Sequence, residues 1–355
     1  MTIHYELADV AQIDAIRLEQ SVEMPFDTLP PHILEHIVGK VVAQDGAKVS
    51  IHYPNGNVGG EITQFLNVLF GNISLLDGIR ITGVDWDELP SDLFGGPTFG
   101  ISGMRERLGA STRPISCTAL KPVGSTPAEF AAMAYEFALG GIDMIKDDHG
   151  LADQPYAPFL DRMKACADAV NEANAKTGGR SVYVPHITGP GEVTERRFEA
   201  AVAAGAGAVL LCPHLAAPDV MHRLARRSDA IPIMAHPAFS GGLVGPTHGF
   251  TRAFLYGALW RALGADFVIY PNTGGRFTYP LADCLAINDT ARGAMNGFAG
   301  AWPTPGGGMQ RATLHKWIET YGKDTCFLIG GSLYQHPDGL RAAAAEIRDL
   351  MESAS

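Results

Sequence analysis

The stretch GGIDMIKDDH, residues 140–149, decides the fold expected of this chain, because an apolar run in it opens directly into a lysine and two acids. The run Ile142–Ile145 has the composition of a buried strand. Successive side chains of a strand point to opposite faces, so Lys146 and Asp148 are expected on one side and Asp147 on the other. Two interpretations are open: a solvated salt-bridge cluster, or a metal site whose oxygen ligands converge from one strand end. In the second, the lysine amine must first become an anion, for example by carbamylation with CO2.

Short apolar runs alternate with helical segments throughout the chain after Pro114. The expected strands are residues 115–120, 142–145, 181–187, 208–212, 231–235, 265–270, 298–302 and 326–329. The helical segments that follow them are residues 127–139, 160–176, 195–204, 218–227, 250–263, 281–292, 313–321 and 339–352. This alternation predicts a parallel (β/α)8 barrel, whose strands are apolar because both of their faces are buried. A doubly wound open sheet is the alternative fold.

The first part of the chain has a different pattern. Residues 1–112 mix short strands and helices with acidic loops, such as Asp85-Trp86-Asp87-Glu88, and predict a smaller α+β domain. Residues 113–355 carry the regular alternation and predict the barrel domain. A chain of 355 residues is long enough for one large domain and a smaller one.

Composition narrows the class of protein. The chain is 46% hydrophobic and 18% charged, and its formal net charge of −11 argues against a nucleic-acid surface. We expect no signal peptide, since Met1–Val10 lacks a basic start and an apolar core, and no membrane span, since no apolar window is long enough. The 5 cysteines are widely spaced and odd in number, which favours reduced thiols in a cytoplasmic protein.

Polar side chains and glycines gather where the predicted strands end, which is where a barrel carries its chemistry. The polar residues are Lys121, Lys146, Asp147, Asp148, His149, His186, His214 and His236. Each histidine alone could be a core residue, but three at successive strand ends favour a functional set. Glycine clusters at 306–308 and 330–331 follow the last two strands, where barrels bind phosphate through backbone N–H groups. Simple turns are the alternative explanation for the glycines.

Several motifs, all in the expected order, resemble those of the RuBisCO superfamily. They are CTALKP at 117–122, GGIDMIKDD at 140–148, MAHPA at 234–238, GGG at 306–308, and IGGSL with HP at 329–333 and 336–337. Upstream, Phe70-Gly71-Asn72 is similar to the segment whose asparagine reaches a neighbouring subunit's metal site. The resemblance extends over most of residues 60–340, and the chain is identified as a RuBisCO-like protein. It implies a ferredoxin-like N-terminal domain, a catalytic barrel, and a homodimer or a larger assembly of dimers.

The resemblance also implies a role for each matching residue. The implied catalytic residues are Lys121, Lys146, His236 and Asn72. The implied metal ligands are the carbamate of Lys146, Asp148 and His149, which would hold Mg²⁺ or another divalent ion. The implied substrate and phosphate contacts are Gly307, Gly308, Gly330, Gly331, Ser332 and Arg276. Asn72, with Glu61, is expected to complete the site of the partner subunit.

Four departures from the family pattern argue against a CO2-fixing carboxylase. His149 stands where the family has a glutamate ligand, and a neutral imidazole is expected to weaken Mg²⁺ binding. The loop at 273–280 lacks the family's lysine. Pro237 replaces an arginine that clamps phosphate, and Val123 replaces a second lysine.

The resemblance implies metal-assisted enolisation of a phosphorylated keto-sugar, in which a base removes a proton beside a polarised carbonyl. Lys121 is the expected base. Asn72 stands where the methionine-salvage enolases have a lysine and cannot accept a proton, so that branch is disfavoured. The compact length and the missing second phosphate clamp resemble the branch of the family that isomerises 5-methylthioribulose 1-phosphate. The resemblance implies this reaction here, with an apolar patch near Met309, Phe277 and Tyr279 for the thiomethyl group.

Three other functions stay open. One is a transcarboxylase or hydrolase of a 3-oxo sugar-acid phosphate, for which Arg276 is the available cation on its loop. Another is the 2,3-diketo-5-methylthiopentyl-1-phosphate enolase. The third is a barrel that binds a ligand without catalysis.

Overall fold

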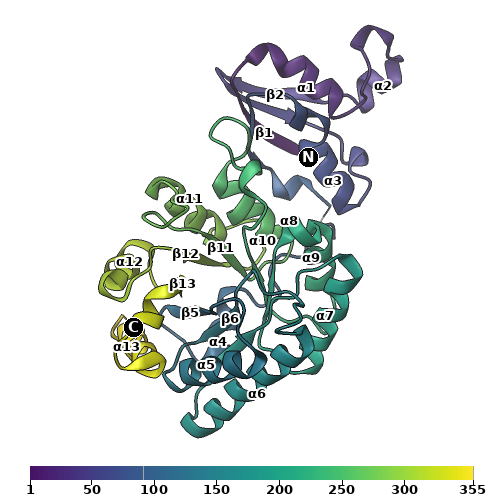
Figure 1. Cartoon of the computed structure of the whole chain (residues 1–355). Coiled ribbons are helices and arrows are strands. Elements are labelled where there is room, and N and C mark those ends of the chain that lie inside the picture. The colour runs from purple at the N-terminus through teal and green to yellow at the C-terminus, as the bar shows by residue number, and fades with distance from the viewer. Residues whose placement is uncertain (91, 355) are drawn as a thin grey trace.

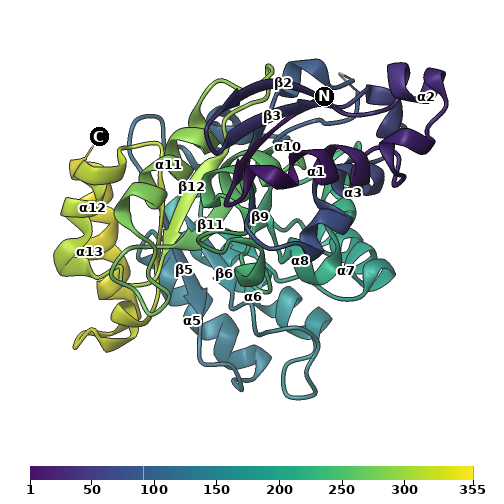
Figure 2. The same cartoon turned by 90° about the horizontal axis from the view of Figure 1, so that it is seen from above.

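The computed structural model describes residues 1–90 and 92–354, which form two sheets (Figure 1). The smaller sheet has the strand order β10-β4-β1-β3-β2, and the larger has the order β7-β6-β5-β13-β12-β11-β9-β8. In Figure 1 the smaller sheet and its helices lie at the top, above the barrel, and Figure 2 views the same arrangement from above.

The N-terminal domain is a βαββαβ unit. Its elements are β1 (Thr2–Leu7), α1 (Ile13–Glu19), β2 (Lys40–Asp45), β3 (Lys48–His52), α3 (Ile62–Phe70) and β4 (Ile79–Val84), with a short α2 (Pro31–His36). Neighbouring strands of the order β4-β1-β3-β2 are antiparallel, which is the ferredoxin-like arrangement. Ile3, Tyr5 and Leu7 alternate along β1 and are buried, as a half-buried strand requires. The predicted α+β domain is confirmed.

The barrel consists of parallel strands only. They are β5 (Ile115–Leu120), β6 (Met144–Asp147), β7 (Val182–Val184), β8 (Val209–Leu211), β9 (Ile233–Ala235), β11 (Phe267–Pro271), β12 (Trp302–Gly306) and β13 (Cys326–Ile329). β13 pairs with β5, and a bridge between His186 and Leu210 joins the end of β7 to β8, so the sheet closes on itself. The predicted barrel is confirmed, and the doubly wound alternative is wrong.

Helices lie outside the strands (Figures 1 and 2). They are α5 (Pro127–Leu139), α6 (Phe159–Thr177), α7 (Gly191–Ala203), α8 (Pro213–Ala216), α9 (Pro218–Ala225), α10 (Trp260–Ala262), α11 (Leu281–Arg292), α12 (Leu314–Tyr321) and α13 (Gly339–Ser353). Among the described residues, no helix combines the length and the apolar character needed to cross a membrane.

One end of the barrel is closed by packing. Met104 and Leu108 of α4 (Gly100–Leu108) join a buried cluster with Ile115, Phe267 and Trp302, which lie at the starts of their strands. α4 therefore packs on the barrel core, although it lies before residue 112. The domain boundary near residue 112 stays a prediction. Because the starts of the strands are filled, the opposite end is left for polar side chains.

Several elements differ from their expected bounds; α7 starts at Gly191 and not at residue 195, and β7 ends at Val184 and not at residue 187. β6 extends through Lys146 and Asp147, because both pair with β5. β12 is Trp302–Gly306, four residues later than the expected 298–302. The expected helix at 250–263 instead starts with β10 (Gly249–Phe250), which pairs with β4, and continues as a π-helix, η7 (Ala253–Leu259).

β10 attaches the N-terminal domain to the barrel. Phe250 packs on Phe70 of α3 with 5.1 Å between ring centroids, and Phe254 of η7 stacks on Trp86 at 6.1 Å. Burial of these aromatic rings explains why a segment with a helical sequence pattern is drawn into the smaller sheet.

Candidate active site

Lys146 is the last residue but one of β6, at the end of the barrel opposite the packed starts of the strands. β6 holds its side chain 2% exposed, and Nζ donates a hydrogen bond to the backbone oxygen of Asp147 at 2.9 Å. Burial lowers the pKa of Lys146, although the charge of Asp148 acts in the opposite direction. A lowered pKa increases the fraction of neutral amine, and the neutral amine is the form that reacts with CO2. This environment is compatible with the predicted carbamylation, which stays a prediction.

Asp147 belongs to a separate, structural network. Its carboxylate accepts hydrogen bonds from Arg162 Nε at 3.1 Å, from the Tyr183 hydroxyl at 2.7 Å and from the His186 amide at 3.0 Å. These contacts fix the end of β6 against α6 and β7. Sequence reasoning missed Arg162, whose only signal is an arginine at a position where α6 is buried.

Asp148 faces Lys121, in agreement with the alternation expected for the strand. Lys121 Nζ and a carboxylate oxygen of Asp148 form an ion pair, and the other oxygen accepts the Gly150 amide at 3.1 Å. Burial alone would raise the pKa of Asp148, but a hydrogen bond with His149 and the charge of Lys146 hold it well below its usual range. The Lys121 side chain is 41% exposed, so it can also reach a bound molecule.

His149 and His236 stack, with ring centroids 4.3 Å apart and planes 15° apart. His149 Nδ1 lies 3.1 Å from Asp148. The Ala238 amide donates to His236 Nδ1 at 3.1 Å, so the proton of the neutral His236 ring is on Nε2. Burial lowers the pKa of His236 well below its ordinary value, and the positive charge of Lys146 adds to this effect. The stack therefore joins the residues that follow the ends of β6 and β9.

The other two strand-end histidines are held by the fold. His186 is buried, its Nδ1 donates to the backbone oxygen of Leu151, and its Nε2 lies 3.6 Å from Cys212 Sγ. His214 Nε2 accepts a hydrogen bond from Trp260 at 3.3 Å. Burial lowers the pKa of each histidine to about 4, so both rings are neutral near pH 7.

The glycine turns after β12 and β13 differ in what they require. Gly308 has φ +69°, and a Cβ on it would lie 2.9 Å from the Gly274 backbone, so glycine is needed for the close contact of two loops. Gly330 and Gly331 have no left-handed backbone, and a Cβ there would meet open space. The turn after β13 is therefore open to a bound anion. Ser332 in the same turn donates a hydrogen bond to the backbone oxygen of Met309 at 3.3 Å.

The expected apolar patch is not one surface. Met309 is 4% exposed, whereas Phe277 is 73% exposed. Tyr279 shares a hydrogen bond of 3.0 Å with the Tyr256 hydroxyl. Arg276 is exposed and its guanidinium lies 5.6 Å from the Phe277 ring.

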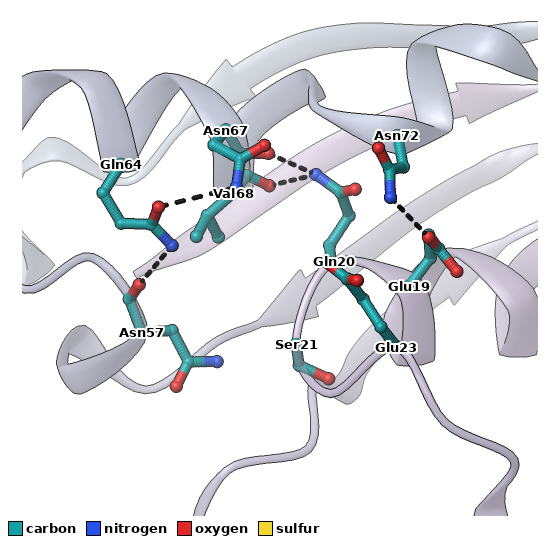
Figure 3. Close-up of a pocket in the computed structure, with 9 residues that line it drawn as sticks. All are labelled: Glu19, Gln20, Ser21, Glu23, Asn57, Gln64, Asn67, Val68 and Asn72. Carbon is teal, nitrogen blue, oxygen red and sulfur yellow. Dashed lines mark hydrogen bonds between the residues drawn. The ribbon is translucent and has the colours of Figure 1, made fainter.

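Asn72 lies in the N-terminal domain, in a polar pocket that Figure 3 shows. Its Nδ2 donates to Glu19 at 2.8 Å, and all residues that line the pocket belong to the N-terminal domain. Glu61 is exposed at the start of α3. Neither Asn72 nor Glu61 has a hydrogen bond or ion pair to Lys121, Lys146, Asp148 or His236 within the described part of the chain.

A divalent metal fits this set of donors only through a modified lysine. In the described part of the chain, no three His, Cys, Asp or Glu side chains are placed to hold a metal ion. A carbamate on Lys146 would add two anionic oxygens beside Asp148 and the His149 ring, which gives oxygen donors suited to Mg²⁺ and one imidazole. The chemistry of the donor set is therefore compatible with the metal.

Known proteins resemble this chain over nearly its whole length. The family model for the ribulose bisphosphate carboxylase large chain, catalytic domain, matches residues 100–278. A protein of Rhodospirillum rubrum named 5-methylthioribulose-1-phosphate isomerase is 40% identical over 94% of this chain and 90% of its own length. A 2,3-diketo-5-methylthiopentyl-1-phosphate enolase of Bacillus pumilus is 32% identical over 86% of this chain and 76% of its own. The crystal structure of a Rubisco-like protein from Rhodopseudomonas palustris superposes with a TM-score of 0.88 and 35% identity, covering 99% of this chain and 97% of that one. The chain therefore belongs to the RuBisCO large-chain family and is one of its RuBisCO-like proteins.

Proposed function

We propose that this protein isomerises a phosphorylated keto-sugar, 5-methylthioribulose 1-phosphate, by metal-assisted proton transfer. The observation that carries the proposal is the cluster of Lys121, Lys146, Asp148 and His236 at the ends of β5, β6 and β9. The printed name of the Rhodospirillum rubrum relative supports the choice of substrate.

Lys121 is the proposed proton carrier, because its amine is partly exposed and contacts Asp148. Once it has given up its own proton, the Lys121 amine takes a proton from the carbon beside the substrate carbonyl, and the electron pair of that C–H bond moves towards the carbonyl oxygen. The former carbonyl oxygen then gains a proton, the neighbouring hydroxyl loses one, and return of a proton to the former carbonyl carbon gives an isomeric ketose with no atom gained or lost. Neutral His236, with its proton on Nε2, can donate a hydrogen bond to a substrate oxygen.

The proposed metal ligands are the Lys146 carbamate, Asp148 and His149. When bound, Mg²⁺ or another divalent ion would stabilise negative charge on the substrate oxygens. The pKa of Asp148 is held low, which keeps this carboxylate ionised and able to act as a ligand at neutral pH.

One phosphate is proposed to bind the backbone of Gly330 and Gly331, with Gly307 and Gly308 opposite and Ser332 and Arg276 nearby. The open space over the turn after β13 supports this placement. Pro237 supplies no arginine side chain for a second phosphate, and the 273–280 loop has no lysine to hold CO2. A monophosphate suits this arrangement better than a bisphosphate, which agrees with an isomerase and not with a carboxylase.

A homodimer is proposed to complete each site, with Asn72 and Glu61 of one subunit facing the barrel of the other. Leu75 follows Asn72 and is 85% exposed, and Phe239, beside the strand-end His236, is 79% exposed. Large exposed apolar side chains on both domains support burial against a second copy.

The 5 cysteines are free and buried, which supports a reducing, cytoplasmic location.

The enolase reaction is the second candidate, because a relative with that printed name is 32% identical. Against it, residue 72 is an asparagine whose carboxamide donates to Glu19 and cannot act as a base.

The test is a substrate panel assayed in D2O. The isomerase substrate should incorporate deuterium and be converted to an isomer with saturation kinetics, while the enolase substrate and 3-oxo sugar-acid phosphates should turn over far more slowly. Lys146→Met should remove the activity, and Lys164→Met, which changes an exposed lysine paired with Asp168, should retain it. Faster turnover of another panel member would assign that reaction instead, and no exchange with any member would support a ligand-binding barrel.

A further inference from the structure

The hydroxyl of Tyr334 forms the two hydrogen bonds to the end of β5 that the backbone of β13 would form if that strand were longer. It accepts a hydrogen bond from the Lys121 amide at 2.9 Å and donates one to the Ala119 backbone oxygen at 2.8 Å. Tyr334 lies in η9 (Gly331–Gln335), the short 3-10 helix that follows the Gly330 turn. One side chain thus joins the proposed phosphate turn to the backbone of the proposed proton carrier.

The register of the two strands explains why the hydroxyl is needed. β13 pairs with β5 from Cys326 opposite Ile115 to Ile329 opposite Thr118. Continued by two residues, this register would set Gly331 opposite Leu120. In a parallel pair, a residue bonds the carbonyl before and the amide after its opposite residue, which here are Ala119 and Lys121.

The chain turns away before Gly331 can make these bonds, and the Tyr334 hydroxyl makes both of them. Ala119 and Leu120 stay paired to β6 on their other side, through Lys146 and Asp147. The end of β5 is therefore held from both sides, although β13 has already ended. Gly331 is exposed and free of this ladder position, so its backbone can face a ligand.

We infer that Tyr334 is a positioning residue, which fixes the backbone at Lys121 and couples it to the Gly330–Gly331 turn. The inference rests on the proposed function for its catalytic consequence, but the hydrogen bonds exist whatever the substrate is. The ring itself is held by an edge contact with Phe137, with centroids 5.6 Å apart, so loss of the hydroxyl alone leaves the packing in place.

The test compares Tyr334→Phe with the wild type in two assays. In hydrogen exchange, the Lys121 amide should exchange about tenfold faster or more in Tyr334→Phe, because its acceptor is gone. Inorganic phosphate should slow this exchange in the wild type and leave it unchanged in the variant. In turnover, kcat should fall by about 10- to 100-fold, the effect of misplacing a reacting group by about 1 Å, while KM changes little.

Two further variants separate positioning from folding. Tyr334→Gln offers an amide that can both accept and donate, and should recover part of kcat and of the amide protection, whereas Tyr334→Met should recover neither. Tyr135→Phe removes a surface hydroxyl that contacts Lys176 and should change nothing. Wild-type exchange at Lys121 in Tyr334→Phe, or equal behaviour of the Gln and Met variants, would overturn the inference. If no panel substrate turns over but the exchange results hold, the proposed function has failed and the coupling stands.

Discussion

Replacing Arg162 by methionine should destabilise the protein by about 3–5 kcal/mol, because it leaves a buried carboxylate without its counter-ion. Arg162 and Asp147 are both fully buried, with Nε 3.1 Å from the carboxylate. The Tyr183 hydroxyl and the His186 amide still donate to Asp147 in the variant, so the carboxylate is not stripped of every partner. The loss should therefore stay within the range for a broken buried pair.

The same substitution removes two bonds to the loop before α6. Arg162 donates to the backbone oxygens of Ala157 at 2.6 Å and of Ala152 at 2.9 Å. This loop follows Asp148 and His149 directly, so its loosening should also lower activity. Methionine retains much of the aliphatic volume, which limits the contribution of an empty cavity to the result.

Urea unfolding followed by circular dichroism gives the change in free energy, and Lys164→Met on the same helix is the matched control. Lys164 pairs with Asp168 on the surface, where such pairs contribute little, so this variant should unfold like the wild type. The double variant Asp147→Asn, Arg162→Met should recover part of the loss, because the uncompensated charge is gone. A loss below about 1 kcal/mol for Arg162→Met, or a double variant less stable than it, would refute the reasoning.

Four other outcomes are expected. Lys146→Met should abolish turnover without lowering stability, since it replaces a buried amine by an apolar side chain; full activity after chelation in CO2-free buffer would contradict the metal and carbamate assignment. Gly331→Val should raise KM for the sugar phosphate and leave stability unchanged, whereas Gly308→Val should also lower the unfolding temperature, because its Cβ would clash with the backbone; equal melting curves would contradict this. Ribulose bisphosphate and labelled bicarbonate should give no protein-dependent fixation, and sustained fixation would restore the carboxylase hypothesis. Mixed Asn72→Ala and Lys146→Met subunits should recover about a quarter of the wild-type activity if dimers exchange at random; no recovery would argue against shared sites.

Local signals in the sequence predicted some elements to the residue. α5 begins at Pro127 after Thr126, which forms a capping box with Glu129, and ends before Gly140. α11 begins directly after Pro280. Helix ends of this kind are set by neighbouring residues, so the sequence is sufficient to place them.

Strand ends in the barrel are set by pairing and could not be placed in the same way. β6 continues through Lys146 and Asp147 because they pair with Ala119 and Leu120 of β5. The polar character of Lys146 and Asp147 gave no sign in the sequence that the strand continues. β12 contains Pro303 and Pro305, which cannot donate to a ladder and make the segment look like a loop. Similarly, a π-helix and a two-residue strand replaced the helix expected at 250–263, because contacts with another domain decide that segment.

The strand-end residues of the site could be selected from the sequence, but their contacts could not. Period-two alternation separated Asp147 from Asp148, as the structure has them. It gave no means of finding the contact between Arg162 and Asp147 or the stack of His149 on His236. Nor could it predict that the Tyr334 hydroxyl bonds the backbone of β5. Each of these joins segments far apart in the chain, so only the packed barrel determines them.

The two aspartates after Lys146 account for how a buried amine is tolerated at this point. Burial disfavours the charged form of Lys146 and lowers its pKa, while the charge of Asp148 and the hydrogen bond to the Asp147 backbone oxygen partly compensate. The buried ion pair between Asp147 and Arg162 fixes the end of β6 on the opposite face of the strand. The side chains of Lys146 and Asp148 are therefore not needed to hold this end in place. The histidine at 149 alters only the third member of the proposed ligand set, since its ring stays beside Asp148 and His236. In the proposed site, the departure from the glutamate that the family resemblance implies should therefore change which metal binds and how tightly, while Lys121 keeps its contact with Asp148 for the proposed proton transfer.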